Sequence, residues 1–182
     1  GDRRSIVKLM KSLGLMSLVT LSCLAQDKPL QAKDYGQWES LRGAGTLAPS
    51  GAWIAYTVNR VDGKDQLRLV SLQEDTEATF AHGKSPRFSK DSRWFGCLIG
   101  ISDEEAERLK EAKKPAQDSF TLRDLADDKD LEIKGVAAFD FSEGGLYLAI
   151  HRARPEGQKK GGADLLVRDL STGEELCFGN VA

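Results

Sequence analysis

The sequence predicts an all-β fold, a partial β-propeller of about three four-stranded blades with a short N-terminal helix and a helical insertion in the second blade. Short apolar runs are separated by turn residues, and the 182 residues include 18 Gly but only 5 Pro. This composition is typical of many short strands joined by tight turns. One motif also recurs three times, and a second motif follows each copy. Repeats spaced by about 45 residues are typical of propellers.

Composition and charge exclude several classes of protein. The chain has 40% hydrophobic and 30% charged residues, close to the average of globular domains, which excludes a disordered, collagen-like or coiled-coil chain. The 26 Lys and Arg against 28 Asp and Glu give a net charge of −2. Because a nucleic-acid-binding protein needs a clustered basic excess, we expect no nucleic-acid partner.

Residues 1–25 resemble a secretory signal peptide. The uncharged run from Leu13 to Ala25 is shorter than the roughly 20 residues that a membrane-spanning helix needs. Cys23 and Ala25 are small residues three and one positions before Gln26, where a signal peptidase would cut. We therefore expect a secreted or periplasmic protein with no membrane span after cleavage. The alternative is lipid attachment at Cys23, but the aliphatic residue usual three positions earlier is missing.

Residues 26–43 are expected to form a linker and the short helix. Asp34 and Gln37 have the spacing of a capping box. Trp38 and Leu41 follow as apolar residues, which we expect to pack against the first blade.

The repeated motif reads apolar, turn, aromatic, apolar. Its copies are spaced by 41 and 53 residues and cover 46–56, 87–97 and 140–150. The second motif covers 69–72, 122–125 and 167–170. In addition, an apolar residue stands eight positions before the second residue of two of the motifs, Phe80 before Phe88 and Ile133 before Phe141. Three correlated features at matching offsets indicate an internal repeat.

We assign residues 44–182 to an incomplete propeller with blades at about 44–82, 86–135 and 137–179. In the first blade the expected strands cover about 44–48, 53–60, 65–72 and 77–81. The second of these strands is apolar on both faces, which suits burial between neighbouring blades. A β-sandwich with accidental similarity is the alternative.

Propellers have about four to eight blades, so three blades imply a truncated one. Phe178 takes the place that Phe80 and Ile133 have in the earlier repeats, and a fourth blade would begin about where the chain stops. Unpaired strand edges favour association. We therefore expect the 182-residue piece alone to be oligomeric or poorly soluble.

Two polar insertions interrupt the repeats. Ser102 followed by Glu105 is a capping box with acidic residues in the first turn, which predicts a solvated helix that stops near Pro115. Residues 154–162 are rich in Gly and Lys and predict a hairpin tip.

A search for chemistry assigns no catalytic, cofactor-binding or metal-binding residue and no cofactor. The motifs Gly-x-Ser-x-Gly, His-Glu-x-x-His and Cys-x-x-Cys are missing. A structural role is favoured for several residues that could in principle carry chemistry: His82, His151, the glycine-rich segment 43–48, the pair Glu104 and Glu105, and Cys97, which is expected to be buried rather than bridged to Cys177.

Three segments carry a resemblance to a known family: Asp34 to Leu41, the repeated motifs, and Gly162 to Glu174. The chain from about residue 34 to 182 resembles the N-terminal propeller of secreted bacterial serine peptidases of the prolyl oligopeptidase family. The resemblance implies a C-terminal α/β-hydrolase domain with a Ser, Asp and His triad that cleaves short peptides, and a propeller that limits access to it. None of the triad residues has a matching position in this sequence.

The function that follows is that of an N-terminal propeller fragment of an exported serine peptidase. Its partners would be oligopeptide substrates and the missing hydrolase domain. The alternative is a non-enzymatic periplasmic binding or scaffold propeller, since similar blade motifs occur in the propeller of the Tol system.

Overall fold

The structure, a computed structural model, describes residues 31, 38–61, 63–154 and 161–181. The predicted signal peptide, the start of the predicted N-terminal helix and the tip of the 154–162 insertion lie outside these residues. The chain divides into two units, Gly1–Gln31 and Ala32–Ala182, and the fold below is that of the second unit.

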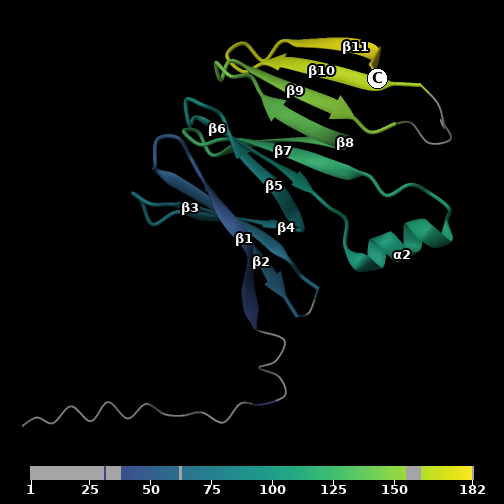
Figure 1. Cartoon of the computed structure of the whole chain (residues 1–182), viewed down its shortest axis with the longest axis horizontal. Coiled ribbons are helices and arrows are strands. Elements are labelled where there is room, and N and C mark those ends of the chain that lie inside the picture. The colour runs from purple at the N-terminus through teal and green to yellow at the C-terminus, as the bar shows by residue number, and fades with distance from the viewer. Residues whose placement is uncertain (1–30, 32–37, 62, 155–160, 182) are drawn as a thin grey trace, which may run out of the picture. The chain divides into compact units, whose positions relative to one another are not determined.

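Two antiparallel sheets make up this unit (Figure 1). The four-stranded sheet has the order β1-β2-β3-β4, and the seven-stranded sheet has the order β11-β10-β9-β8-β7-β6-β5. The strands are β1 (Glu39–Leu47), β2 (Trp53–Arg60), β3 (Gln66–Ser71), β4 (Glu77–Ala81), β5 (Gly83–Phe88), β6 (Trp94–Ile99), β7 (Asp118–Asp124), β8 (Lys129–Phe141), β9 (Tyr147–Arg152), β10 (Ala163–Asp169) and β11 (Glu175–Val181). The predicted all-β class and partial propeller are confirmed, whereas the blade number and boundaries stay predictions.

The three sequence motifs fold into the same turn. In each, the N–H of the third residue donates to the carbonyl of the aromatic residue five positions later, over 2.8 to 2.9 Å: Ala48 to Trp53, Ser89 to Trp94 and Ser142 to Tyr147. The sixth residue of each motif has a positive φ: Gly51 at 73°, Ser92 at 59° and Gly145 at 75°. The sequence repeat is therefore also a repeat of backbone conformation.

The second motif also recurs as a structure. The leucine that ends each copy donates its N–H to a carbonyl in the first turn of the same repeat: Leu72 to Ala52, Leu125 to Arg93 and Leu170 to Leu146. The residue before it accepts N–H bonds of the following turn on its side chain: Ser71, Asp124 and Asp169. These hydrogen bonds connect the two turns at one end of each repeat.

Asp124 shows how such a buried acid is kept charged. Burial by itself would raise the pKa of the Asp124 carboxyl, but the 3.0 Å bond from Arg93 Nη2 and the N–H bond from Ala126 lower this pKa overall. The Arg93 guanidinium also lies over the Trp94 ring, 5.3 Å from its centroid. The carboxylate therefore links the first turn of the repeat to the second.

Consecutive repeats are joined at one left-handed residue. His82 has a φ of 54° between β4 and β5, and Gly135 has a φ of 68° within β8. The first half of β8 pairs with β7 and the second half with β9, with register shifts near Gly135. His82 and Gly135 both lie two positions after the apolar residues Phe80 and Ile133, which explains the eight-residue spacing in the sequence.

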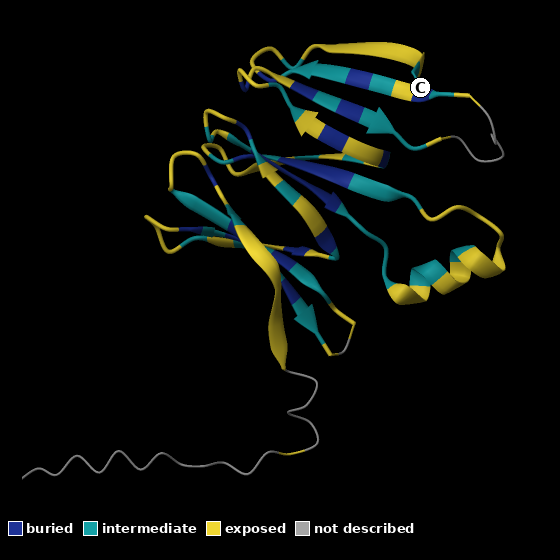
Figure 2. Cartoon of the chain, viewed as in Figure 1, coloured by how far each residue is buried: buried dark blue, intermediate teal, exposed yellow. Residues whose placement is uncertain are grey.

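The core lies between successive repeats (Figure 2). One cluster combines Leu67, Leu69 and Phe80 of the first sheet with Phe95 and Cys97 of β6. The other cluster lies within the seven-stranded sheet: Leu98, Phe120, Leu122, Val136, Phe139, Leu148, Ile150, Leu166 and Leu170. Gly96 contributes no side chain here, because a Cβ would lie 2.8 Å from the Phe139 ring.

The predicted N-terminal helix is wrong for its described residues, since Glu39–Leu47 is strand β1. Leu41, expected to pack on the first blade, is 70% exposed. Gly43 has a φ of 71° at the register shift in the β1–β2 ladder. Pairing with β2 gives the segment backbone partners instead.

The predicted polar helix is confirmed as α2 (Asp103–Glu111), with Ser102 as N-cap and Asp103, Glu104 and Glu105 in its first turn. None of its residues is buried, as Figure 2 also shows. Among the described residues, no helix has the length and apolar content needed to cross a bilayer.

The turn shared by the three motifs leads to a prediction about the free energy of unfolding. Gly145 has a φ of 75°, and a Cβ added there would have no atom within 3.4 Å. Replacing it by Ala should lower the free energy of unfolding by about 1–2 kcal/mol, because Ala is strained in the left-handed region. The control is Gly144→Ala at the preceding position, where φ is not positive and space is open. Urea denaturation of both variants measures the difference, and equal losses would contradict the assignment.

Candidate functional site

The inner groove runs along β5, between β1 on one side and the second half of β8 on the other. Two hollows make it up. The first has a volume of about 520 Å³ and the second about 620 Å³. Both are lined by Thr46, Ser85 and Pro86, so they adjoin along β5.

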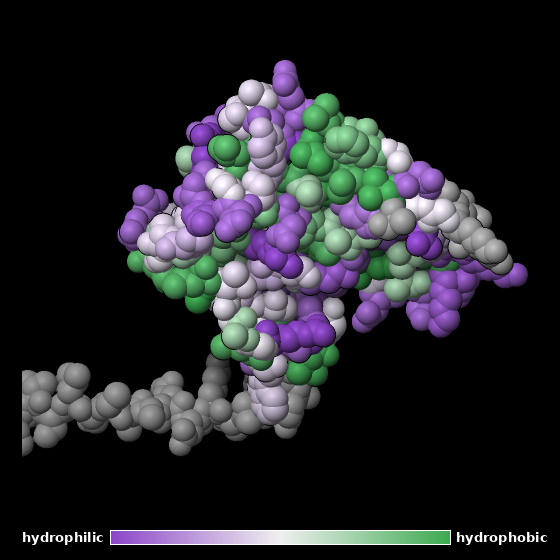
Figure 3. Space-filling view, turned by 45° about the horizontal axis from the view of Figure 1, so that its top comes forward, coloured by the Kyte–Doolittle hydropathy of each residue, from purple (hydrophilic) through white to green (hydrophobic). Residues whose placement is uncertain are grey.

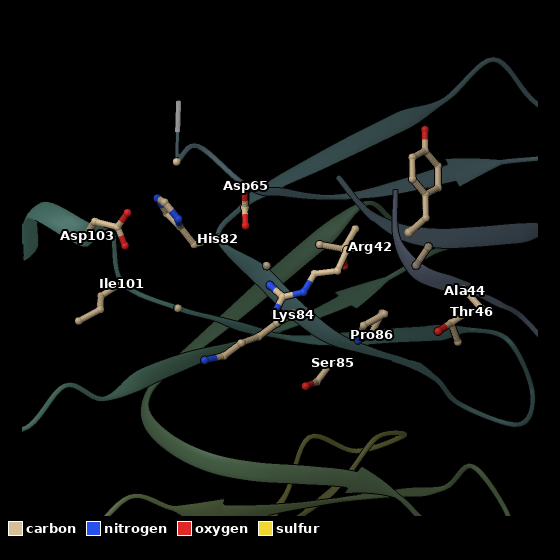
Figure 4. Close-up of a pocket in the computed structure, with 16 residues that line it drawn as sticks. Arg42, Ala44, Thr46, Asp65, His82, Lys84, Ser85, Pro86, Ile101 and Asp103 are labelled. Carbon is tan, nitrogen blue, oxygen red and sulfur yellow. The ribbon is translucent and has the colours of Figure 1, made fainter. Parts of the chain in front are cut away.

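The first hollow is mainly polar (Figure 4). Arg42 of β1 and Lys84 of β5 extend into it, and Asp65 and His82 lie toward the end next to Asp103, the first residue of α2. A Cβ on Gly63 would lie 3.2 Å from the Asp103 carboxylate. The start of α2 therefore borders one end of the groove.

Backbone bulges shape the strands that line the groove. The β1 ladder shifts register between Arg42 and Thr46, and the β5 ladder between Lys84 and Arg87. Ser85, inside the second bulge, has a φ of 54°, and Pro86 beside it has no N–H to give to a ladder. Bulges of this kind redirect side chains at strand edges, and here they lie beside the groove.

The charges of the groove are only partly paired. Lys84 Nζ lies 2.8 Å from Asp118 Oδ2, and Arg87 Nη1 lies 3.2 Å from Asp140 Oδ1, which links β5 to β8. Arg42 has no ion pair with any residue in the described ranges. The groove can therefore offer a guanidinium, hydroxyls and strand-edge backbone groups to a polar or anionic ligand.

His82, Ser85 and Asp65 line the same hollow but do not form a triad. Figure 4 shows the His82 ring and the Ser85 hydroxyl at separate places in the hollow. No hydrogen bond between the side chains of these three residues occurs in the described part of the chain. His82 contributes through its backbone, which accepts from Gly100 N–H and donates to the Asp65 carbonyl. The arrangement supports binding rather than nucleophilic catalysis.

The other residues singled out in the sequence have structural places. The 43–48 segment is mostly strand and does not start a helix, so it cannot hold a pyrophosphate as a dinucleotide motif would. Glu105 donates its N–H to the Ser102 cap and pairs with Arg108 at 3.0 Å. His151 lies within β9. Among the described residues, no group of three His, Cys, Asp or Glu could hold a metal ion.

Cys97 is buried as predicted, and Cys97 and Cys177 are both free thiols. Burial raises the pKa of the Cys97 thiol to about 12. Such a raised pKa keeps Cys97 in the thiol form, which is a poor nucleophile.

Sequence reasoning missed the inner groove. Arg42, Lys84 and Arg87 are separate basic residues in the sequence, and they come together only because β1 and β5 are neighbours. Arg42 and Lys84 lie shortly before the motifs at 46–56 and 87–97, and Arg87 is the first residue of the second motif, but these positions do not reveal that β1 and β5 are neighbours.

The reactivity of the two thiols Cys97 and Cys177 tests the burial of Cys97. At pH 8 we expect iodoacetamide to label Cys177 in the native chain and to leave Cys97 unlabelled, since a thiol with a pKa near 12 is ionised in only about one molecule in ten thousand. Peptide mapping by mass spectrometry reads both sites, and urea-unfolded chain is the positive control. Rapid native labelling of Cys97 would show that it is not buried.

Comparison with known proteins supports the fold. No family model matches the chain, and no curated protein does. The β-propeller domain of the trilobed protease from Pyrococcus furiosus, described as having an open velcro topology, is similar with 17% identity and a TM-score of 0.50 over 78% of this chain and 43% of that one. A structure from a study of two prolyl endopeptidases and their inter-domain dynamics has 16% identity and a TM-score of 0.54, over 79% of this chain and 22% of that one.

These likenesses establish a β-propeller fold. This chain spans less than half the length of either structure.

Proposed function

We propose that the chain is the propeller part of an exported serine peptidase of the prolyl oligopeptidase family, and that it controls which peptides reach a catalytic domain elsewhere in the polypeptide. The observation that carries this proposal is the inner groove, which offers a guanidinium, hydroxyls and strand-edge backbone groups along β1 and β5. The similar fold of the two protease structures supports the same interpretation, as does the resemblance of the sequence motifs.

In this proposal the chemistry belongs to the hydrolase domain. There a serine attacks the peptide carbonyl, a histidine takes its proton, an acid orients the histidine, and backbone amides stabilise the oxyanion. The propeller residues would act before that step. By admitting short peptides and excluding folded proteins, they would change which substrates are cut rather than the rate of the chemical step.

The groove suggests how a peptide would be admitted. Exposed backbone and hydroxyl groups on β1 and β5 suit the main chain of an extended peptide, and Arg42 suits a carboxylate. Residues 1–25 would direct the polypeptide to the periplasm or the exterior and be removed before Gln26. The partners would then be oligopeptides and the catalytic domain.

The first experiment is to read the coding sequence beyond Ala182. Further blades followed by a Gly-x-Ser-x-Gly elbow, and then Asp and His in that order, would support the peptidase. Blades followed directly by a stop codon would overturn it and favour a binding or scaffold protein. Labelling of the native polypeptide by a serine-reactive probe is the biochemical counterpart.

The position of helix α2 leads to a prediction about the length of the peptides that are cleaved. Replacing residues 102–114 by a short turn in the native polypeptide should increase cleavage of longer peptides severalfold relative to short ones, because α2 borders the groove. Stability should change by less than about 1 kcal/mol, because α2 buries no residue. Cleavage of a peptide ladder, followed by mass spectrometry, measures the profile.

The control for this variant is Lys110→Gln, which removes only a 3.3 Å surface pair with Glu107 and should leave the profile unchanged. A helix-free variant that folds and keeps the original length profile would contradict a gating role.

A further inference from the structure

The first two repeats place a basic residue at the same position. Arg42 of β1 lies opposite Thr57, and Lys84 of β5 lies opposite Leu98. Thr57 and Leu98 are themselves matching positions, because they are as far apart as the first two copies of the repeated motif. Both basic side chains extend into the first hollow of the inner groove (Figure 4). Two equivalent cations therefore face one cavity.

The two cations differ in their partners. Lys84 Nζ lies 2.8 Å from Asp118 Oδ2, at the start of β7. Counted back from the second motif, the residue that matches Asp118 in the first repeat is Asp65. Asp65 makes no ion pair with Arg42 or with any other residue that the structure describes. The first repeat therefore has the same base and the same acid, but the two do not pair.

The connection between the second and third strands explains this difference. In the first repeat a short turn joins β2 to β3, and Asp65 Oδ1 accepts the Arg60 N–H over 3.0 Å across that turn. In the second repeat the insertion with helix α2 replaces the turn, so the Asp118 carboxylate is available to Lys84. Because the turn holds the Asp65 carboxylate, the Arg42 guanidinium is left without an acidic partner in the described ranges.

The surroundings of Arg42 favour a polar ligand with a negative charge. Hydrophobic side chains gather over β9 to β11 in Figure 3, whereas the first hollow lies between the first and second repeats and has a mainly polar lining. Its two carboxylates, Asp65 and Asp103, lie toward the end next to α2 (Figure 4). The β1 side, with Arg42 and the hydroxyl of Thr46, is therefore the side that suits an anion.

We propose that Arg42 binds a carboxylate of a peptide in the inner groove, either the C-terminal carboxylate or that of an acidic side chain. This inference deepens the proposed function and rests on it in taking the ligand to be a peptide. A guanidinium can donate two parallel N–H bonds to one carboxylate, and the edges of β1 and β5 can pair with the main chain that follows. Arg42 then determines which peptides are held and takes no part in the chemical step.

The experiment compares the binding of three peptides to the native polypeptide. They are N-acetyl-pentaalanine with a free C-terminal carboxylate, its C-terminal amide, and the same amide with a central Glu. Isothermal titration calorimetry measures each Kd, after treatment with a serine-reactive probe so that no peptide is cleaved. At least one carboxylate peptide should bind about tenfold or more tightly than the uncharged amide, as expected for hydrogen bonds to charged groups. Which one does so identifies the source of the carboxylate.

Two variants remove the guanidinium in different ways, and each should abolish this preference. Arg42→Gln deletes the charge. Thr57→Asp keeps Arg42 but places a competing carboxylate directly opposite it on β2. The matched control is Thr57→Asn, which has nearly the same shape without the charge and should bind like the wild type. Lys129→Gln removes a positive charge that lines neither hollow and should also leave the preference unchanged.

Equal binding of all three peptides would overturn the proposal. A carboxylate preference that persists in Arg42→Gln would overturn it too, and Thr57→Asp decides if circular dichroism shows that Arg42→Gln does not fold. Failure of the proposed peptidase function gives a different result. A polypeptide that the serine-reactive probe does not label, but that still prefers carboxylate peptides in an Arg42-dependent way, would contradict the peptidase and support this inference.

Discussion

The burial of one apolar face of each repeat under the next repeat is the interaction on which this fold depends. A single four-stranded antiparallel sheet cannot bury both of its faces, and here the buried side chains are shared between neighbours. Phe80 of β4 meets the Phe95 ring of β6, and the Arg123 guanidinium lies 5.3 Å from the centroid of the Phe80 ring. Phe120 and Phe139, with ring centroids 4.5 Å apart, make the corresponding contact within the seven-stranded sheet. Inner strands, turns and groove are positioned by this packing.

The turns are adapted to the same arrangement. The sixth position of the motif needs a positive φ, which Gly51 and Gly145 adopt readily. Ser92 adopts it at a conformational cost, and its hydroxyl accepts a 2.9 Å bond from Ser50 N–H in the neighbouring repeat. A residue that is locally unfavourable therefore connects two neighbouring repeats.

Much of the fold could be predicted from the sequence, because turn chemistry and side-chain alternation are local. The motifs around Trp53, Trp94 and Tyr147, and the capped helix after Ser102, follow from neighbouring residues alone. The strand Glu39–Leu47 could not be predicted in the same way, since its pairing with β2 outweighs a local capping pattern. The inner groove depends on which strands become neighbours, and no local signal in Arg42 or Lys84 encodes that.

Gly96 shows how closely neighbouring repeats fit. The Phe139 ring and the Phe120 ring take up the room that a side chain at position 96 would need. In the preceding pair of repeats the corresponding positions are held by Ala55 and Pro86, which both line the first hollow. The two side chains at such a contact share one space, so the size of one limits the size of the other. During divergence, positions 96 and 139 are therefore constrained to change together, a small residue on one repeat permitting a large one on the next.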